Sequence, residues 1–286
     1  MWGLSFPAIS VGLEYLPPLL FAAFRYDVAA ALLLVYVAVT TDEWLPHARN
    51  DLEAVAGGGI FLVAGNGLLF IGQQTVPSGV AAILQALVPI LTALWALGLL
   101  GERLSGVGAV GVALGLLGVG LIVQPDPGNL LAADTVGRLI VVGQVLSVSL
   151  GGVLVQRAEP SIPRASLTAW SMLVGGVVLH VLSVVARETP TGAALAPTAV
   201  GAIVYLGVFS TALAFIIYFT ILGEYGAFEA SLVAYLVPIV ATVAGVLLLG
   251  EAISYVSVAG FGVVCVGFAL LKRHALVEFV GLGVSG

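Results

Sequence analysis

One segment of the chain occurs twice. Residues 68–123 and 217–272 align without a gap at an offset of 149, and fifteen of the 56 aligned positions are identical. Several identities are Pro, Gly and Glu, such as Pro89 with Pro238, which chance overlap of apolar sequence rarely aligns. Self-similarity at a fixed spacing is typical of an architecture built from repeated units. The sequence therefore predicts two copies of one structural unit.

Composition indicates that this unit lies in a membrane. Hydrophobic residues make up 60% of the 286 residues, charged residues make up 8%, and the mean hydropathy is +1.18. A helix needs roughly 20 apolar residues to cross about 30 Å of hydrocarbon. Short stretches of polar residues, proline or glycine divide the chain into apolar runs of about that length. The predicted spans are 1–13, 19–40, 55–74, 79–100, 105–124, 135–157, 164–186, 197–222, 228–249 and 254–273.

A membrane β-barrel is the rival architecture, because Val and Gly are abundant. Barrel strands alternate apolar and polar residues over about ten positions. The runs 29–39 and 240–249 are instead apolar on every side. Helices are therefore favoured, and glycine inside them suits close packing of transmembrane helices.

The number of spans in each copy determines how the copies are oriented. A unit of five helices that starts on one side of the membrane ends on the other, so the second copy enters in the opposite direction. We therefore expect an all-α integral membrane protein with ten transmembrane helices arranged as two inverted five-helix repeats. The expected divisions are a first repeat over 1–124, a connecting loop over 125–134, a second repeat over 135–274 and a tail over 275–286.

The basic residues predict which side the termini face, because cytoplasmic loops carry an excess of Lys and Arg. With the N-terminus inside, only Arg138 and Arg187 lie outside. Both termini are therefore expected in the cytoplasm of a multi-pass protein of the plasma membrane. The basic residues placed on the cytoplasmic side are Arg49, Arg103, Arg157, Arg164, Lys272 and Arg273.

The first span is short. Thirteen residues at about 1.5 Å each reach only about 20 Å. Either the helix is truncated at a misassigned start, or it stops inside the membrane against its neighbours. Alignment with the second copy favours truncation.

Charge and motifs restrict the function classes. A net charge of −6 leaves no basic patch for nucleic acid. The three histidines have no metal-ligand spacing, and the chain lacks both a His-Glu-x-x-His zinc motif and a phosphate-binding loop. We therefore expect no metal, cofactor or catalytic residue. The expected partners are a small-molecule substrate and the lipid bilayer, and a homodimer is compatible with the sequence.

Several short motifs in both copies resemble a known protein family. The stretch 80–90, which ends Leu-Val-Pro-Ile, and Leu-Leu-Gly-Glu at 99–102 are similar to the EamA domain of the drug/metabolite transporter superfamily. The second copy repeats the pattern, and Trp-Gly-Leu-Ser-Phe at 2–6 also resembles that family. The resemblance implies a ten-helix carrier with a central pathway between its halves. Gln85 departs from the pattern, in which this stretch is apolar.

Two prolines are candidates for the pathway. Pro89 and Pro238 each remove a backbone donor inside a helix and free a carbonyl. This suits a bent helix that lines a cavity, where water or substrate satisfies the carbonyl. The alternative is a kink packed against neighbouring helices.

Arg25 and Asp27 fall within the second span, where ionisable groups are costly and usually face partners or water. One interpretation is a pair that reaches toward the membrane surface. The other is contact of Arg25 with an anionic part of the substrate.

Polar residues on several spans suggest an internal site. Symmetry between the copies should bring Asn66, Gln85, Tyr218 and Tyr235 toward one axis near the midplane. Hydrogen bonds that hold helices together explain such residues equally well. Further polar residues on these spans are Gln73, Gln144, Ser147 and Tyr205.

Glu102 and Glu251 lie at equivalent helix ends. A structural role beside the helix-starting Ser105 and Ser254 competes with a role in proton coupling, and the first is favoured.

These observations predict a secondary-active transporter, a permease or an exporter, which moves small metabolites by alternating access. A channel-like facilitator is the nearest alternative, and an intramembrane enzyme is a more distant one.

Overall fold

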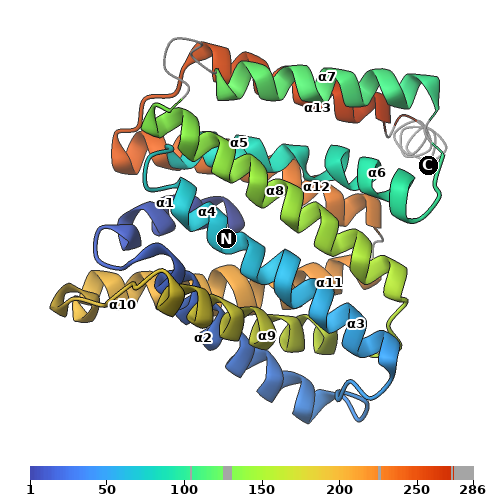
Figure 1. Ribbon diagram of the computed structural model, residues 1–286, viewed down its shortest axis with the longest axis vertical. Coiled ribbons are helices and arrows are strands. Elements are labelled where there is room, and N and C mark those ends of the chain that lie inside the picture. The colour runs from blue at the N-terminus through green and yellow to red at the C-terminus, as the bar shows by residue number, and fades with distance from the viewer. Residues whose placement is uncertain (104, 125–130, 225–226, 272, 274–286) are drawn as a thin grey trace.

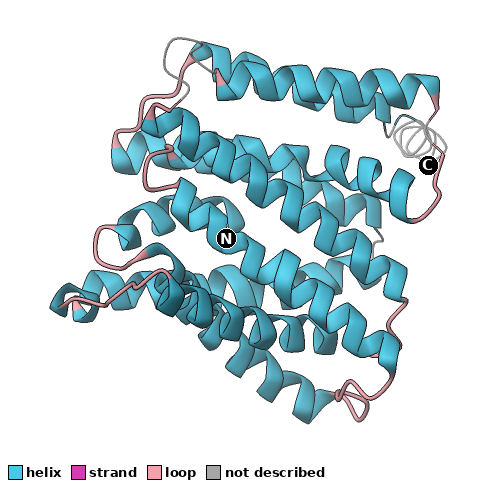
Figure 2. Ribbon diagram, viewed as in Figure 1, coloured by secondary structure: helices cyan, strands magenta, loops and turns pink. Residues whose placement is uncertain are grey.

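The computed structural model describes residues 1–103, 105–124, 131–224, 227–271 and 273, and for residues 219, 221–224 and 227–235 it covers the backbone alone. Every regular element in this part of the chain is helical (Figure 2). This confirms the predicted all-α class. The α-helices are α1 Trp2–Leu13, α2 Pro18–Thr40, α3 Arg49–Gly57, α4 Gly67–Gly72, α5 Ser78–Leu84, α6 Val88–Leu99, α7 Gly106–Val123, α8 Ala133–Ala158, α9 Arg164–Val185, α10 Pro197–Val204, α11 Ala214–Glu224, α12 Ala227–Leu249 and α13 Tyr255–Leu271.

Several of these elements join end to end into longer helices. Within the described residues, seven such helices are long and apolar enough to cross a membrane, and α1, α13 and part of α12 form shorter apolar helices. The seven are Pro18–Thr40, Arg49–Gly72, Ser78–Leu99, Gly106–Val123, Ala133–Ala158, Arg164–Val185 and Pro197–Tyr218.

Prolines and glycines set where helices begin and end. Pro17, Pro77 and Pro163 each precede a helix in an extended conformation, with ψ between 144° and 147°. Proline has no N–H to donate and its ring clashes with the preceding turn of a helix, so at these positions no helix continues from the preceding residues and a new one begins directly after the proline. Gly101 and Gly250 lie just beyond α6 and α12 with φ of 69° and 65°. Glycine adopts this left-handed conformation readily, so it ends both helices in the same way.

Two of the long helices contain a π-helical segment. The segment η1 spans Gly58–Val63 and η5 spans Tyr205–Leu213. Gly58 and Gly207 are 149 residues apart, which is the offset of the sequence repeat. Gly58 packs against Ser171 of α9, and Gly207 packs against the backbone of α2 at Arg25. The same distortion therefore occurs at the same place in both copies.

The helices stack in layers along the long axis of the molecule (Figure 1). The pair α7–α13 lies at one end, and the pair α2–α9 lies at the other. Between them lie α5, α6, α8 and α12, and then α1, α4 and α11. Connections between the helices alternate between the left and right edges of the view, as expected of a chain that crosses the bundle repeatedly.

The packing follows the repeat. Helix α12 packs against α1, and α6, its counterpart in the first copy, packs against α8. Likewise η1 packs against α9, and η5 packs against α2. In these two cases, a contact between the copies therefore has an equivalent in which the copies exchange places.

Candidate functional site

Four polar side chains form one continuous chain of hydrogen bonds inside the bundle. Gln85 donates from Nε2 to Oε1 of Gln144 at 2.7 Å, and Gln144 donates from Nε2 to Oδ1 of Asn66 at 3.1 Å. Asn66 in turn donates from Nδ2 to the hydroxyl oxygen of Tyr26 at 2.6 Å. These residues come from four of the long helices. The polar chain, as we call these four residues, therefore links helices from both copies.

Local backbone distortions place two of these amides. Asn66 ends the 3₁₀ turn η2, Ala64–Asn66, and Gln85 begins the 3₁₀ turn η3, Gln85–Leu87. Each turn interrupts a long helix, and a 3₁₀ stretch within a helix often marks a functional hinge. The third amide, Gln144, lies on the regular helix α8 and is only 2% exposed. A buried amide is costly unless it is hydrogen-bonded, so these contacts explain how it is accommodated.

Arg25 lies beside this chain and is 6% exposed. Its Nε donates to the hydroxyl of Thr211 in η5 at 2.9 Å. The guanidinium carbon lies 5.2 Å from the ring centre of Tyr26 and 5.9 Å from that of Phe70. Arginine near an aromatic face is attracted by the ring. Among the described residues, however, Arg25 forms no ion pair.

Asp27 belongs to a different contact. Its Oδ2 lies 2.7 Å from Nε2 of His180 on α9, and both side chains are partly exposed. Arg25 and Asp27 therefore do not form the pair that one of the two interpretations described, because the two side chains leave α2 in different directions. Only Arg25 enters the interior.

The prolines differ in their backbone context. Pro238 lies inside α12 and is buried, whereas Pro89 lies in the first turn of α6 after η3. The carbonyl that Pro89 leaves unbonded is that of Gln85, and it accepts a hydrogen bond from the N–H of Val88. This carbonyl is therefore occupied, which removes one of the reasons for placing Pro89 on the pathway.

Tyr218 lies in an apolar setting. Its ring centre is 5.4 Å from that of Trp2, and both residues line a groove of about 380 Å³ between α1, α11 and α12. The side chain of Tyr235 lies outside the described residues. Of the four side chains expected to converge, the structure thus joins Asn66 and Gln85 through Gln144.

Three residues of this region were not among the predicted pathway residues. Gln144 was noted as a polar residue on its helix, and its place between two other amides depends on long-range packing. Tyr26 and Thr211 carry no local signal, because a tyrosine or threonine in an apolar helix is common. Their position next to Arg25 and Asn66 could have been inferred only from contacts between helices.

Carboxylates hold the starts of several helices. Glu251 accepts hydrogen bonds from the Ser78 N–H at 2.9 Å, the Ser78 hydroxyl at 2.8 Å and the Gly79 N–H at 3.3 Å. Glu188 accepts from the N–H groups of Leu19 and Leu20 at the start of α2. A carboxylate is favoured at a helix N-terminus because the free N–H groups there carry partial positive charge. Glu251 therefore has a structural role, but it caps the start of α5 in the first copy rather than the helix that follows Glu251 in the chain.

The expected helix-starting serines are also present. The hydroxyl of Ser105 accepts from the N–H of Gly108, and that of Ser254 accepts from the N–H of Ser257, both at 3.1 Å. In contrast to Glu251, Glu102 is exposed, and its side chain contacts no described residue through a hydrogen bond or ion pair.

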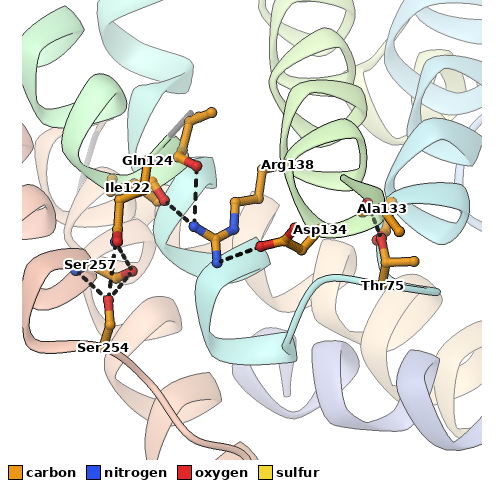
Figure 3. Close-up of polar contacts among 10 residues, drawn as sticks. Thr75, Ile122, Gln124, Ala133, Asp134, Arg138, Ser254 and Ser257 are labelled. Carbon is orange, nitrogen blue, oxygen red and sulfur yellow. Dashed lines mark hydrogen bonds and ion pairs between the residues drawn. The ribbon is translucent and has the colours of Figure 1, made fainter. Parts of the chain in front are cut away.

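A junction of helix ends lies where α7 ends and α8 begins (Figure 3). Arg138 of α8 donates to the carbonyl oxygens of Ile122 and Val123, the last residues of α7, at 3.0 and 3.2 Å. It also lies 3.7 Å from Asp134. A cation is favourable at a helix C-terminus, where carbonyl groups lack partners. The side chain of Arg138 is therefore committed to holding helix ends together.

The arrangement is suited to binding. The polar chain and Arg25 offer amides, hydroxyls and one guanidinium. Within the described residues, no group of three or more His, Cys, Asp or Glu side chains is placed to hold a metal ion.

Comparison with known proteins identifies the family. The EamA-like transporter family matches residues 1–124 and 135–273. The uncharacterized inner membrane transporter YedA of Escherichia coli K12 is 31% identical over 275 residues, covering 95% of this chain and 87% of that protein. An uncharacterized transporter of Archaeoglobus fulgidus is 28% identical over 274 residues, which cover 95% of each protein.

Two further proteins are similar to this chain over most of its length. A probable amino-acid metabolite efflux pump of Salmonella typhimurium is 27% identical over 278 residues, covering 93% of this chain and 89% of that protein. One solved crystal structure matches with a TM-score of 0.63 at 20% identity, covering 96% of this chain and 95% of that one. Its fold is therefore shared across nearly the whole chain. This multi-pass membrane protein belongs to the EamA-like transporter family.

Proposed function

We propose that the protein is a secondary-active carrier of small metabolites that works by alternating access. The observation that carries this proposal is the polar chain, which joins helices of both copies inside a predominantly apolar bundle. Polar groups in the membrane interior are destabilised without partners and often mark a substrate pathway. Carriers built from inverted repeats hold substrate near the midplane, where the repeats meet.

Contacts at the two faces of the bundle support ten crossings in inverted repeats. At one face, Glu251 beyond α12 meets the start of α5, and Glu188 beyond α9 meets the start of α2. At the other, Asp51 near the start of α3 accepts from Ser161 before α9. These pairs agree with a chain whose five-helix copies run in opposite directions. We place both termini in the cytoplasm and the protein in the plasma membrane.

The paired π-helical segments support movement at equivalent positions. Such segments within α-helices occur frequently at functional sites. Here η1 packs against α9 and η5 against α2, so each lies at the boundary between the copies. Two equivalent half-structures that exchange shape would open a central site to alternate sides.

Asn66 and Gln85 are proposed as the centre of the pathway, together with Gln144 and Tyr26, and Arg25 lies beside them. The remaining pathway residues of the proposal are Pro89, Tyr218, Tyr235 and Pro238. The name of the Salmonella relative, a probable amino-acid metabolite efflux pump, favours export of amino-acid-like metabolites. Energy would come from an ion or substrate gradient.

Exchange transport tests this proposal. Full-length protein is reconstituted into liposomes that are loaded with one unlabelled amino acid, and entry of the same labelled amino acid is measured for a panel of amino acids. A carrier binds substrate on either side, so internal amino acid accelerates entry of the label. Entry that is unaffected by internal amino acid would favour the channel-like facilitator. Liposomes that behave like protein-free ones for every compound would contradict transport of this substrate class.

A matched pair of variants connects the activity to the site. Gln144→Leu removes the central amide of the polar chain and should reduce exchange at subsaturating substrate. Gln73→Leu removes another buried amide, which donates to the Phe6 carbonyl at 3.0 Å and so holds α1. It should leave the substrate concentration dependence unchanged. Equal effects of the two substitutions would make the polar chain a structural contact.

A further inference from the structure

We propose that the carrier's substrate bears a carboxylate and that Arg25 binds it. This inference rests on the proposed function and deepens it by naming the chemical group of the substrate that is recognised and the residue that binds it. The observation behind it is a buried positive charge to which the described residues supply no carboxylate. Asp27, the nearest carboxylate along the chain, contacts His180 instead.

The electrostatic cost of Arg25 requires a compensating group. Removing a guanidinium from water costs several kcal/mol unless an opposite charge or ordered polar groups accompany it. The Tyr26 and Phe70 rings offer partial compensation through their faces. The hydroxyl of Thr211 supplies one neutral acceptor. An anion would be stabilised strongly here, because charge-assisted hydrogen bonds are about twice as strong as neutral ones.

Arg25 and the adjacent Tyr26 both have donors left over. Thr211 donates its own proton to the Leu206 carbonyl at 2.7 Å, so it can only accept from Arg25. Tyr26 accepts from Asn66, and its O–H has no acceptor among the described residues. The guanidinium N–H groups other than Nε are likewise not hydrogen-bonded there. An ionised carboxylate accepts and does not donate, so it matches this set of groups.

The backbone holds the arginine in place. A Cβ on Gly207 would lie 3.1 Å from the carbonyl oxygen of Arg25, so this glycine lets η5 approach α2 closely. That approach brings Thr211 within hydrogen-bonding distance of Nε. At the corresponding distance beyond Pro163, α9 carries Ser171, which is buried against Gly58. The second copy therefore lacks a guanidinium here, and the proposal is for one anion-binding position in the chain.

The experiment compares acids with their amides. Purified full-length protein is tested by thermal shift with leucine and leucinamide, phenylalanine and phenylalaninamide, and benzoate and benzamide. Each pair differs at the carboxylate and keeps the rest of the molecule. We expect at least one acid to raise the melting temperature in proportion to its binding, and its amide to need at least about tenfold higher concentration for the same shift.

Variants test whether Arg25 causes the preference for the acid over its amide. Arg25→Gln should bind the acid and its amide equally, and Arg25→Lys should retain part of the preference for the acid. Thr211→Val, which removes the acceptor that positions Nε, should weaken acid binding about fivefold. Arg138→Gln is the matched control, because that arginine holds the end of α7 and should leave the acid preference unchanged.

A chemical measurement on the unmutated protein covers the case in which Arg25→Gln does not fold. Phenylglyoxal, which modifies arginine, is applied to the protein in liposomes, and modification at Arg25 is quantified by peptide mass spectrometry. We expect modification that the binding acid prevents and its amide does not, whereas the exposed Arg49 reacts in every sample.

Three results would overturn the inference. They are equal stabilisation by acid and amide, an unchanged acid preference in Arg25→Gln, and an Arg25 that is unreactive or equally reactive with and without every acid. Exchange transport of a neutral or cationic compound alongside any of these results would leave the carrier function intact and reject only the carboxylate. Absence of exchange would instead reject the proposed function.

Discussion

At the scale of single residues, Gln144 holds the polar chain together. It accepts from Gln85 and donates to Asn66, so its loss leaves the amides of these two half-buried residues without their partners. Interhelical hydrogen bonds in membranes contribute about 0.6 kcal/mol on average, and a buried unpaired group costs about 1–3 kcal/mol. Gln144→Leu should therefore lower the free energy of unfolding by about 1–3 kcal/mol, measured by SDS titration in mixed micelles.

The role of Arg25 could be predicted only in part from the sequence. Its type and its place inside an apolar span left two interpretations open, and burial of its side chain argues against the one in which it reaches toward the membrane surface. Helix geometry alone argues against its pairing with Asp27, because side chains two residues apart on a helix point about 200° apart. The contacts of each side chain then depend on which helices pack on either side.

At the scale of elements, glycine controls how closely α7 and α13 approach. A Cβ on Gly111 would clash with the Gly267 carbonyl oxygen and lie 3.0 Å from the Leu271 nitrogen, both backbone atoms. Backbone cannot move aside cheaply, and overpacking typically costs about 1–3 kcal/mol. Gly111→Ala should lower the free energy of unfolding by that amount.

Gly120 on the same helix provides the control, because nothing lies within 4 Å of its added Cβ. Gly120→Ala should be neutral or slightly stabilising, since alanine favours the helix by about 1 kcal/mol. Equal destabilisation by the two substitutions, in the same mixed-micelle titration, would contradict close packing as the role of Gly111.

A second prediction at this scale concerns the helix starts. Glu251 stabilises the first turn of α5, whereas its repeat equivalent Glu102 has no hydrogen-bonding partner among the described residues. Loss of a capping side chain costs about 0.5–2 kcal/mol. Glu251→Ala should lower the melting temperature of the purified protein, and Glu102→Ala should change it little. A comparable loss in both variants would mean that the two carboxylates play the same role.

At the scale of the whole molecule, the sequence predicted what repetition and hydropathy determine. The helical class follows from long apolar runs, and the described helices overlap every predicted span, although the span predicted from residue 55 begins at Arg49. The π-helical segments η1 and η5 were not predicted, because their distortion depends on glycine contacts with another helix. The same reason applies to the polar chain, whose members lie far apart in sequence and meet only through tertiary packing.

The opposite orientation of the two copies is the central claim, because it is what would allow them to exchange roles during transport. Arg103 and Ala252 are repeat equivalents and both are exposed beyond the ends of α6 and α12. Single cysteines at these positions, in a Cys265→Ala background, can be labelled in intact cells with a membrane-impermeant maleimide. The proposal predicts labelling of Ala252→Cys from outside, and of Arg103→Cys only after the membrane is permeabilised. Labelling of both positions from the same side would contradict the inverted repeat.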